Sequence, residues 1–171
     1  DGFARTIFSD IDQGAADARW LHDVLKAKRI VTIHDGSAYA QQLTAETARN
    51  FRRLGGTVLS EEAVAPTDID MHPLLTRIAT EKPDAFYFPI FVAAAAQVLR
   101  QSKELPGLKD VPKMGGGALM APEMIEAAGA AVVGFRIGYP DVSPAAMAPR
   151  PYTTLQSVFV AGSPPTDAAL D

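Results

Sequence analysis

Two short segments carry the histidines and carboxylates whose types and spacing could support catalysis or metal binding. His34 and Asp35 are neighbours, as a general base and its orienting carboxylate would be. However, adjacent side chains of a strand point to opposite faces, so this pair is not expected to form a relay. Asp68 and Asp70 alternate with His72 at a spacing that could hold a metal ion. We favour the alternative that they open the following helix by accepting hydrogen bonds from its backbone N–H groups.

The glycine run Gly115–Gly117 raises the question of phosphate binding. It lacks the lysine and serine of a P-loop and does not form a G-x-G-x-x-G pattern after a long strand. A turn is therefore expected, and a close approach of the backbone to a ligand stays open. The sequence contains neither a G-x-S-x-G elbow nor an H-E-x-x-H motif. Because no acid, base and nucleophile can be assembled, we expect a binding protein rather than an enzyme, with no cofactor and no metal ion.

Three segments with side chains suited to ligand binding follow predicted strands. They are His34–Tyr39, Pro89–Val92 and Gly115–Leu119. In an open α/β sheet, ligands bind in the crevice beyond the carboxyl ends of the strands. Tyr39 lies where a helix begins, so its ring could stack on a ligand while its hydroxyl donates a hydrogen bond. The alternative, in which Tyr39 packs between helix and loop, stays open at this point.

The composition is that of a globular α/β domain. The chain has 171 residues, of which 47% are hydrophobic, and a formal net charge of −4. This charge, with no long basic run, argues against a nucleic-acid partner. The absence of cysteine excludes disulfides, thiolate metal sites and cysteine nucleophiles. No apolar stretch is long enough to span a bilayer.

Strands and helices are predicted to alternate along residues 3–139. Runs of β-branched and aromatic residues predict strands at Phe3–Phe8, Arg29–His34, Thr57–Glu61, Ala85–Ile90, Val111–Met114 and Val132–Tyr139. Apolar residues at helical spacing predict helices at Ile11–Lys26, Ala38–Leu54, Pro73–Glu81, Phe91–Lys103 and Pro122–Ala128. The alternation indicates a three-layer α/β/α, doubly wound and mostly parallel Rossmann-like sheet.

The sequence changes in character after Tyr139. The segment that follows is rich in proline and alanine, and Gly162-Ser163-Pro164-Pro165 forms a further break. We therefore divide the chain into a ligand-binding lobe, residues 1–139, and an extended tail, residues 140–171. The tail is expected to carry at most one short element, at about Thr153–Val160.

Six short segments of the lobe, taken in chain order, carry a resemblance to a known family. They are Phe3-Ala4-Arg5-Thr6 with Ser9-Asp10 and Gln13-Gly14; Ile33-His34-Asp35 with Tyr39; Leu54-Gly55-Gly56-Thr57-Val58; Asp70 with Pro73-Leu74-Leu75 and Ile78; Pro83-Asp84-Ala85-Phe86-Tyr87; and Leu99-Arg100-Gln101. In this order the chain resembles the second lobe of type I periplasmic solute-binding proteins. That family delivers branched-chain amino acids and related molecules to ABC transporters. The resemblance fades after Tyr139.

The resemblance implies a two-lobed protein that closes on a small solute by a hinge motion and performs no chemistry of its own. Its implied partners are a small-molecule ligand, the missing first lobe and the membrane permease of an ABC transporter. Its implied location is the periplasm or the outer cell surface. The alternative is the ligand-sensing domain of a receptor or regulator, because such proteins use the same fold.

The resemblance also implies the ligand-contacting positions. It places one aromatic ring at Tyr39 and a second at Phe91, and Ser37 and Pro89 join them in the predicted ligand-binding set. At Gly117, amino-acid-binding members carry an acidic residue that holds the ammonium group of the ligand. Without it, an ammonium group would lose a charge-assisted partner worth about 1.5–3 kcal/mol. We therefore expect a ligand without a free amino group, such as an aromatic or aliphatic carboxylate or an amide.

The chain is also expected to be incomplete. The family's first lobe precedes this segment, and the remainder of that lobe normally follows it. A lone lobe has its own core and should fold, but it would expose half of an apolar cleft. Because exposed apolar surface of this kind often finds a partner, we predict self-association as a homodimer.

Overall fold

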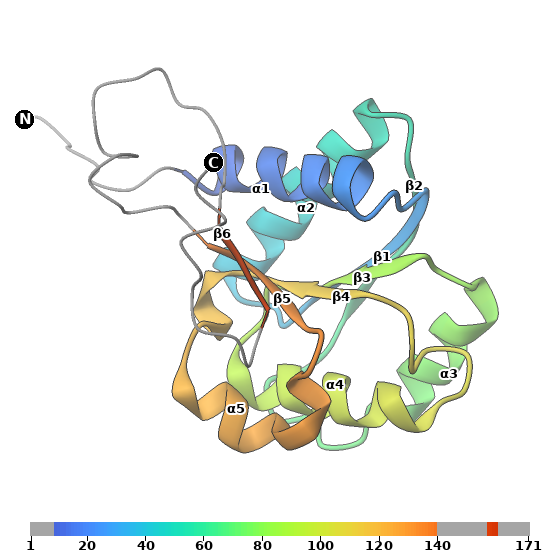
Figure 1. Cartoon of the computed structure of the whole chain (residues 1–171), viewed down its shortest axis with the longest axis vertical. Helices are drawn as coiled ribbons and strands as arrows, with labels where there is room; N and C mark the ends of the chain where they lie inside the picture. The colour runs from blue at the N-terminus through green and yellow to red at the C-terminus, as the bar shows by residue number, and fades with distance from the viewer. Residues whose placement is uncertain (1–8, 140–156, 161–171) are drawn as a thin grey trace, which may run out of the picture.

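The computed structural model describes residues 9–139 and 157–160, which form a six-stranded sheet between two layers of helices (Figure 1). The strands are β1 (Arg29–His34), β2 (Thr57–Ala63), β3 (Ala85–Tyr87), β4 (Lys113–Gly115), β5 (Arg136–Tyr139) and β6 (Ser157–Val160). Their order is β2-β1-β3-β4-β5-β6, with β1 to β5 parallel and β6 antiparallel to β5. The mostly parallel sheet predicted from the sequence is confirmed.

The helices cover both faces of the sheet. They are α1 (Asp10–Arg19), α2 (Ala38–Arg53), α3 (His72–Glu81), α4 (Val92–Glu104) and α5 (Pro122–Ala128). A π-helical turn, η1 (Trp20–Val24), continues α1, and two 3-10 turns, η2 (Gly117–Leu119) and η3 (Gly129–Val132), flank α5. In Figure 1, α1 and α2 lie on one face, and α3, α4 and α5 lie on the other. This is the three-layer, doubly wound arrangement that the sequence predicts.

Local signals in the sequence explain where the helices begin and end. The N-cap of α1, Ser9, accepts a hydrogen bond from the backbone N–H of Asp12, whose carboxylate accepts in return from Ser9. Helix α2 ends at Arg53, one residue earlier than predicted. Gly55 follows with a φ of +91°, the left-handed conformation that suits glycine after a helix.

Three strands are shorter than predicted, and one of them, β4, runs from Lys113 to Gly115 rather than from Val111 to Met114. Strand β3 ends at Tyr87 rather than at Ile90, and the chain then turns into α4. Strand β5 begins at Arg136 rather than at Val132, because the preceding residues form η3 and Gly134 takes a φ of +81°. A left-handed residue cannot continue a β-ladder, so the apolar run before Arg136 is a turn.

The core has two parts, one on each face of the sheet. Phe86 and Phe88 of the β3 region pack with apolar side chains of α3, α4 and α5. Tyr87, on the opposite face of the same strand, packs with α1 and α2 through Ala18 and Leu43. All five of these side chains are buried. The alternation along β3 is what a strand covered by helices on both faces requires.

The ends of the chain contribute one described strand. Strand β6 lies within the segment Thr153–Val160, where the sequence predicts a single short element, and it pairs with β5. The predicted strand Phe3–Phe8 and the remainder of the 140–171 tail lie outside the described residues. In the part of the chain that the structure describes, no helix is both long enough and apolar enough to span a membrane.

Candidate functional site

Three loops meet at the carboxyl-terminal edge of the sheet. They follow β1, β3 and β4, which are neighbouring parallel strands, so their ends lie at the same edge. The loops are residues 35–37, residues 88–91 and residues 116–119. All the ligand-contacting residues that the sequence predicts lie in these loops or in the first turn of α2.

The loop after β1 is a hydrogen-bonded turn that starts α2. Gly36 has a φ of +81°, and its N–H donates to Nδ1 of His34 at 3.2 Å. The side-chain amide of Gln41 donates to the Gly36 carbonyl at 2.8 Å. Ser37 is the N-cap of α2, and its hydroxyl oxygen accepts from the backbone N–H of Ala40 at 3.2 Å. These bonds fix the position of the first turn of α2, where Tyr39 lies.

Asp35 connects this turn with the loop after β3. Its Oδ1 accepts from the backbone N–H of Ser37 at 3.1 Å and from the Ser37 hydroxyl at 2.6 Å. Its Oδ2 accepts from the backbone N–H of Phe91 at 3.0 Å. Burial alone would raise the pKa of Asp35, which is 4% exposed, but the hydrogen bonds from Ser37 and Phe91 outweigh burial and lower it. Asp35 therefore stays ionised at neutral pH.

The aromatic rings of Tyr39 and Phe91, on the two segments that Asp35 connects, lie side by side. The ring centroids of Tyr39 and Phe91 are 6.2 Å apart, and the ring planes are inclined by 42°. Phe91 is 50% exposed, whereas Tyr39 is half-buried. The two rings that the sequence predicts at this edge thus come together from different loops. They form an aromatic surface of the kind that stacks on a flat apolar ligand.

Gly116 allows Tyr39 to approach the loop after β4. A β-carbon at Gly116 would lie 2.4 Å from the Tyr39 hydroxyl oxygen and 2.8 Å from Cβ of Pro89. Burial raises the pKa of Tyr39 to about 12, although the nearby backbone N–H groups of Ala118 and Gly117 act in the opposite direction. Tyr39 is therefore a neutral hydrogen-bond donor at neutral pH.

Gly117 faces the ring of Tyr139 at the end of β5. A β-carbon at Gly117 would lie 3.1 Å from Cδ2 of Tyr139, which is closer than ordinary van der Waals contact. Any longer side chain at this position would require the ring to shift. Sequence reasoning did not single out Tyr139, although its place as the last residue of a parallel strand at the same edge was a usable signal.

A second buried carboxylate, Asp17, lies deeper in the molecule between α1 and β3. The Tyr87 hydroxyl donates to its Oδ2 at 2.5 Å, and its Oδ1 makes no hydrogen bond within the described part of the chain. Burial raises the pKa of Asp17 to about 7, against the opposing effects of Tyr87 and Gln13. A β-carbon at Gly138 would lie 2.2 Å from the Asp17 Oδ1, so that glycine is required for the carboxylate to fit.

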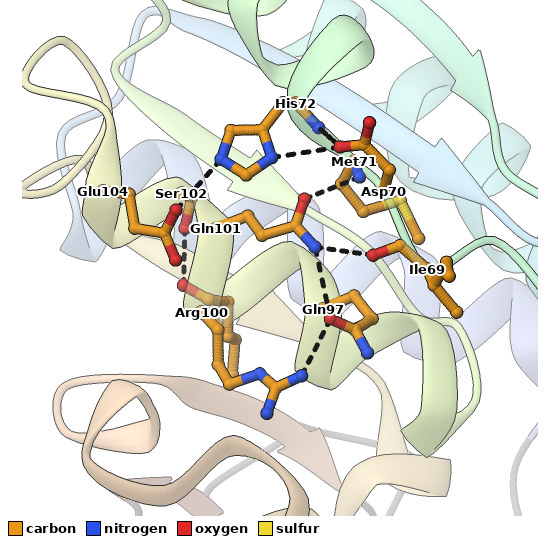
Figure 2. Close-up of polar contacts among 10 residues, drawn as sticks. Ile69, Asp70, Met71, His72, Gln97, Arg100, Gln101, Ser102 and Glu104 are labelled. Carbon is orange, nitrogen blue, oxygen red and sulfur yellow. Dashed lines mark hydrogen bonds and ion pairs between the residues drawn. The ribbon is translucent and has the colours of Figure 1, made fainter.

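Of the two aspartates predicted to open α3, Asp70 accepts from the first residue of the helix, whereas Asp68 bonds outside it (Figure 2 shows Asp70 and His72). The Asp70 Oδ1 accepts from the backbone N–H of His72 at 3.0 Å, and Asp68 accepts from the backbone N–H of Ala65. The two ring nitrogens of His72 contact Asp70 and Glu104 at 3.0 and 2.9 Å. Within residues 9–139 and 157–160, no group of three histidine, aspartate or glutamate side chains is placed to hold a metal ion.

A buried glutamine fastens the same segment to α4. Gln101 accepts from the backbone N–H of Met71 at 2.6 Å and donates to the carbonyl oxygen of Ile69 at 2.7 Å (Figure 2). Its amide nitrogen also donates to Oε1 of Gln97 at 3.2 Å. This arrangement is structural, because every polar atom of Gln101 already has a protein partner.

The family model described as periplasmic binding protein matches residues 1–168 of the chain. A Leu/Ile/Val-binding protein of Citrobacter freundii is 29% identical over 105 residues, which cover 61% of this chain and 28% of the relative. A crystal structure of a leucine-binding protein from Thermotoga maritima superposes with a TM-score of 0.74 at 32% identity, covering 80% of this chain and 39% of that one.

A more distant structure has the same fold. The solute-binding protein of a Rhodopseudomonas palustris ABC transporter, solved in complex with benzoate, has a TM-score of 0.67 at 23% identity and covers 78% of this chain and 36% of that one. The chain thus spans less than half the length of these relatives, all of which are binding proteins rather than enzymes. With the family model matching nearly its whole length, the chain belongs to the periplasmic binding protein family.

Proposed function

We propose that the chain is one lobe of a two-lobed solute-binding protein that takes up a small carboxylate without a free amino group for an ABC transporter. The observation that carries this proposal is the contact between Gly117 and Tyr139. The resemblance places the acidic partner of an amino-acid ammonium group at Gly117, and here the aromatic ring of Tyr139 lies 3.1 Å from the point where such a side chain would start.

The rings at the site favour a flat or apolar ligand. Phe91 is half exposed at the edge of the sheet, and Tyr39 lies beside it with a hydroxyl hydrogen that can donate to a ligand oxygen. An aromatic carboxylate combines a ring that packs against Phe91 with an oxygen that accepts from Tyr39. In this proposal Ser37 and Pro89 shape the wall, because the Ser37 hydroxyl is bonded to Asp35 and Ala40 and Pro89 is buried.

The start of α4 gives no net preference between an anion and an ammonium group. Helix α4 begins at Val92 with no side-chain cap and no acidic residue in its first turn. The free N–H groups at a helix N-terminus carry partial positive charge. The ionised Asp35, whose Oδ2 accepts from the backbone N–H of Phe91 at 3.0 Å, opposes this field with its negative charge.

The relatives mark out the range of ligands to test. Branched-chain amino acids are the ligands named for the Citrobacter protein, and benzoate is bound by the Rhodopseudomonas protein of the same fold. Because the chain carries no acidic side chain at position 117, we place its ligand nearer to benzoate than to leucine. The loss of the ammonium partner is worth about 1.5–3 kcal/mol, or roughly a tenfold to hundredfold change in affinity.

The partners follow from the same proposal. A first lobe completes the cleft, and a membrane permease receives the ligand at the periplasmic or outer face. On its own, the chain is proposed to form a homodimer that covers the exposed ring of Phe91, which is 50% exposed. Light scattering at high concentration checks the dimer, and a single monomeric mass would count against it.

Calorimetric titration with benzoate, leucine and leucinamide tests the ligand class. The titration uses the chain itself and a two-lobed form in which the chain is joined to a first lobe. The proposal predicts that benzoate binds the two-lobed form more tightly than either amine. If leucine were the tightest of the three, the absence of an acidic residue at Gly117 would not determine specificity, and the proposed ligand class would be wrong.

Two glutamate variants sharpen this test. Gly117→Glu supplies the missing carboxylate and is expected to improve leucine binding and weaken benzoate binding, once Tyr139 yields by a few tenths of an ångström. Gly107→Glu is the matched control, because a β-carbon there would lie 3.6 Å from Ala79, an ordinary contact away from the three loops. The control should leave the order of affinities unchanged.

A further inference from the structure

We propose that Asp35 is a positioning residue for the aromatic surface, holding the ring of Phe91 against that of Tyr39. The inference rests on the proposed function, since it concerns how the same edge of the sheet holds a ligand ring. The observation is that one carboxylate bonds both loops that carry the rings. Its Oδ1 holds Ser37 and its Oδ2 holds the backbone N–H of Phe91.

The bridge joins segments that are distant in sequence. Asp35 and Phe91 are 56 residues apart, and they lie at the ends of β1 and β3, which are adjacent in the sheet. The ladder between these strands includes the pair Thr32 with Tyr87, at the end of β3. Beyond that pair, the hydrogen bond between the Asp35 carboxylate and the Phe91 backbone N–H links the two loops.

Each arm of the bridge reaches one ring. On one side, the Ser37 hydroxyl donates to Asp35 and accepts from the N–H of Ala40, which fixes the first turn of α2 around Tyr39. On the other side, Phe91 is the N-cap of α4 and has no side-chain cap of its own. The direction of the exposed Phe91 ring therefore depends on the Phe91 backbone. The hydrogen bond to Asp35 holds that backbone in place.

The chemistry of the bridge requires a carboxylate. Asp35 is 4% exposed, and within residues 9–139 no lysine, arginine or histidine forms a salt bridge with it. Its charge is balanced by N–H and O–H donors that approach both oxygens. An asparagine has the same shape but only one accepting oxygen, so it can keep one arm and must lose the other.

A double-mutant cycle separates positioning of the ring from general damage to the fold. Asp35→Asn is made in the natural chain and in Phe91→Ala, and benzoate affinity is measured by titration followed by NMR. The proposal predicts that Asp35→Asn weakens benzoate binding about tenfold when Phe91 is present and less than about twofold in Phe91→Ala. Equal losses in both backgrounds would overturn the proposal, because Asp35 would then not act through the ring.

Asp84→Asn is the matched control. Asp84 also accepts from two backbone N–H groups, those of Lys28 and Arg29 at 2.9 and 2.8 Å, but it does so at the amino-terminal end of β1. A single oxygen accepts both bonds, so an asparagine can replace it. Asp84→Asn is expected to leave benzoate affinity unchanged, and a loss as large as that of Asp35→Asn would contradict a role specific to the ligand edge.

Hydrogen exchange of backbone amides tests the bridge independently of any ligand. The Phe91 amide is expected to exchange faster in Asp35→Asn than in the natural chain or in Asp84→Asn. If benzoate failed to bind the two-lobed form while the Phe91 amide lost its protection in Asp35→Asn, the ligand class would be wrong and the bridge would stand. Unchanged exchange at both the Phe91 and the Ser37 amides would overturn the bridge whatever the ligand.

Discussion

Two aspartates, one at the ligand edge and one deeper in the interior, have opposite pKa shifts. Asp35 is 4% exposed, and three donors approach its two oxygens. Asp17 is fully buried, and Tyr87 donates to one oxygen while the other has no hydrogen bond within the described residues. The pKa of Asp35 is lowered, whereas burial raises that of Asp17 to about 7.

The difference shows that both depth and the number of hydrogen-bond donors decide the charge of a carboxylate in this fold. Turn geometry supplies the donors at Asp35, because the backbone N–H groups at the starts of two helices point toward it. Asp17 lies within α1, where the backbone N–H groups are used by the helix, so only side chains can reach it. The ligand edge therefore holds a fixed negative charge, and the interior holds a group that titrates near neutral pH.

The largest expected effect is on the pH dependence of stability through Asp17. Its pKa is about 7 in the folded chain and near the ordinary value of 3.8 in the unfolded chain, so the folded state binds the extra proton between these values. Unfolding free energy should therefore fall as pH rises from about 4 to about 7, by a few kcal/mol at about 1.4 kcal/mol per pKa unit. Asp17→Asn should remove this fall, as urea denaturation over that range can show.

Asp110→Asn provides the control for Asp17, because the Asp110 side chain is 87% exposed. The pH profile of this variant should follow that of the natural chain. If Asp17→Asn also followed the natural profile, Asp17 would be ionised throughout this range, and the contrast with Asp35 would disappear.

The contribution of Asp35 to the unfolding free energy should depend on pH in the sense opposite to that of Asp17. The pKa of Asp35 is lowered in the folded chain, so its contribution is present above the unfolded value of about 3.8 and is lost as pH falls through the folded value. Asp35→Asn is expected to cost about 1–3 kcal/mol at pH 7, because one backbone donor loses its acceptor. The cost should shrink at acid pH, and a cost that grew on acidification would refute the assigned charge.

Ser37→Ala tests one arm of the bridge and is expected to have a smaller effect. The change removes the hydroxyl that donates to Asp35 and caps α2, and it should cost about 1 kcal/mol in unfolding free energy. It should also raise the pKa of Asp35, which NMR titration of the carboxyl carbon can follow. Ser9→Ala is the comparison, because it removes the N-cap of α1 and should leave the Asp35 pKa unchanged.

The smallest effect is expected at the exposed His72. Hydrogen bonds to Asp70 and Glu104 raise the pKa of His72, so its contribution is present below the unfolded value of about 6.5 and is lost as pH rises through the folded value. His72→Gln should lower the melting temperature slightly at pH 5.5 and less at pH 8. A larger fall at pH 8 would contradict the charged pairing.

Much of the fold could be predicted because its signals are local. The run Arg-Ile-Val-Thr-Ile-His is β1 with the predicted bounds, and α5 also begins and ends where the sequence indicates. The start of β5 was missed because the left-handed φ of Gly134 cannot be read from an apolar run. A glycine interrupts a strand only when its backbone takes that conformation, and the neighbouring residues determine whether it does.

The site could be predicted only in part. The family resemblance places Tyr39 and Phe91 at this edge, Tyr39 also lies where a predicted helix follows a strand, and the role of both as ligand contacts stays a prediction. The bridging role of Asp35 was missed, because its second partner lies 56 residues away and depends on two loops having the correct register. Asp17 and Tyr87 are 70 residues apart and have no sequence signal at all.

The central claim is that a carboxylate without an amino group binds at the edge formed by the loops after β1, β3 and β4. The most direct measurement is an NMR titration of the chain with benzoate and, separately, with leucine, following every backbone amide. The account predicts that benzoate shifts the amides of Tyr39, Phe91 and Gly117 at lower concentration than leucine does. Stronger shifts with leucine, or benzoate shifts confined to residues away from these loops, would contradict it.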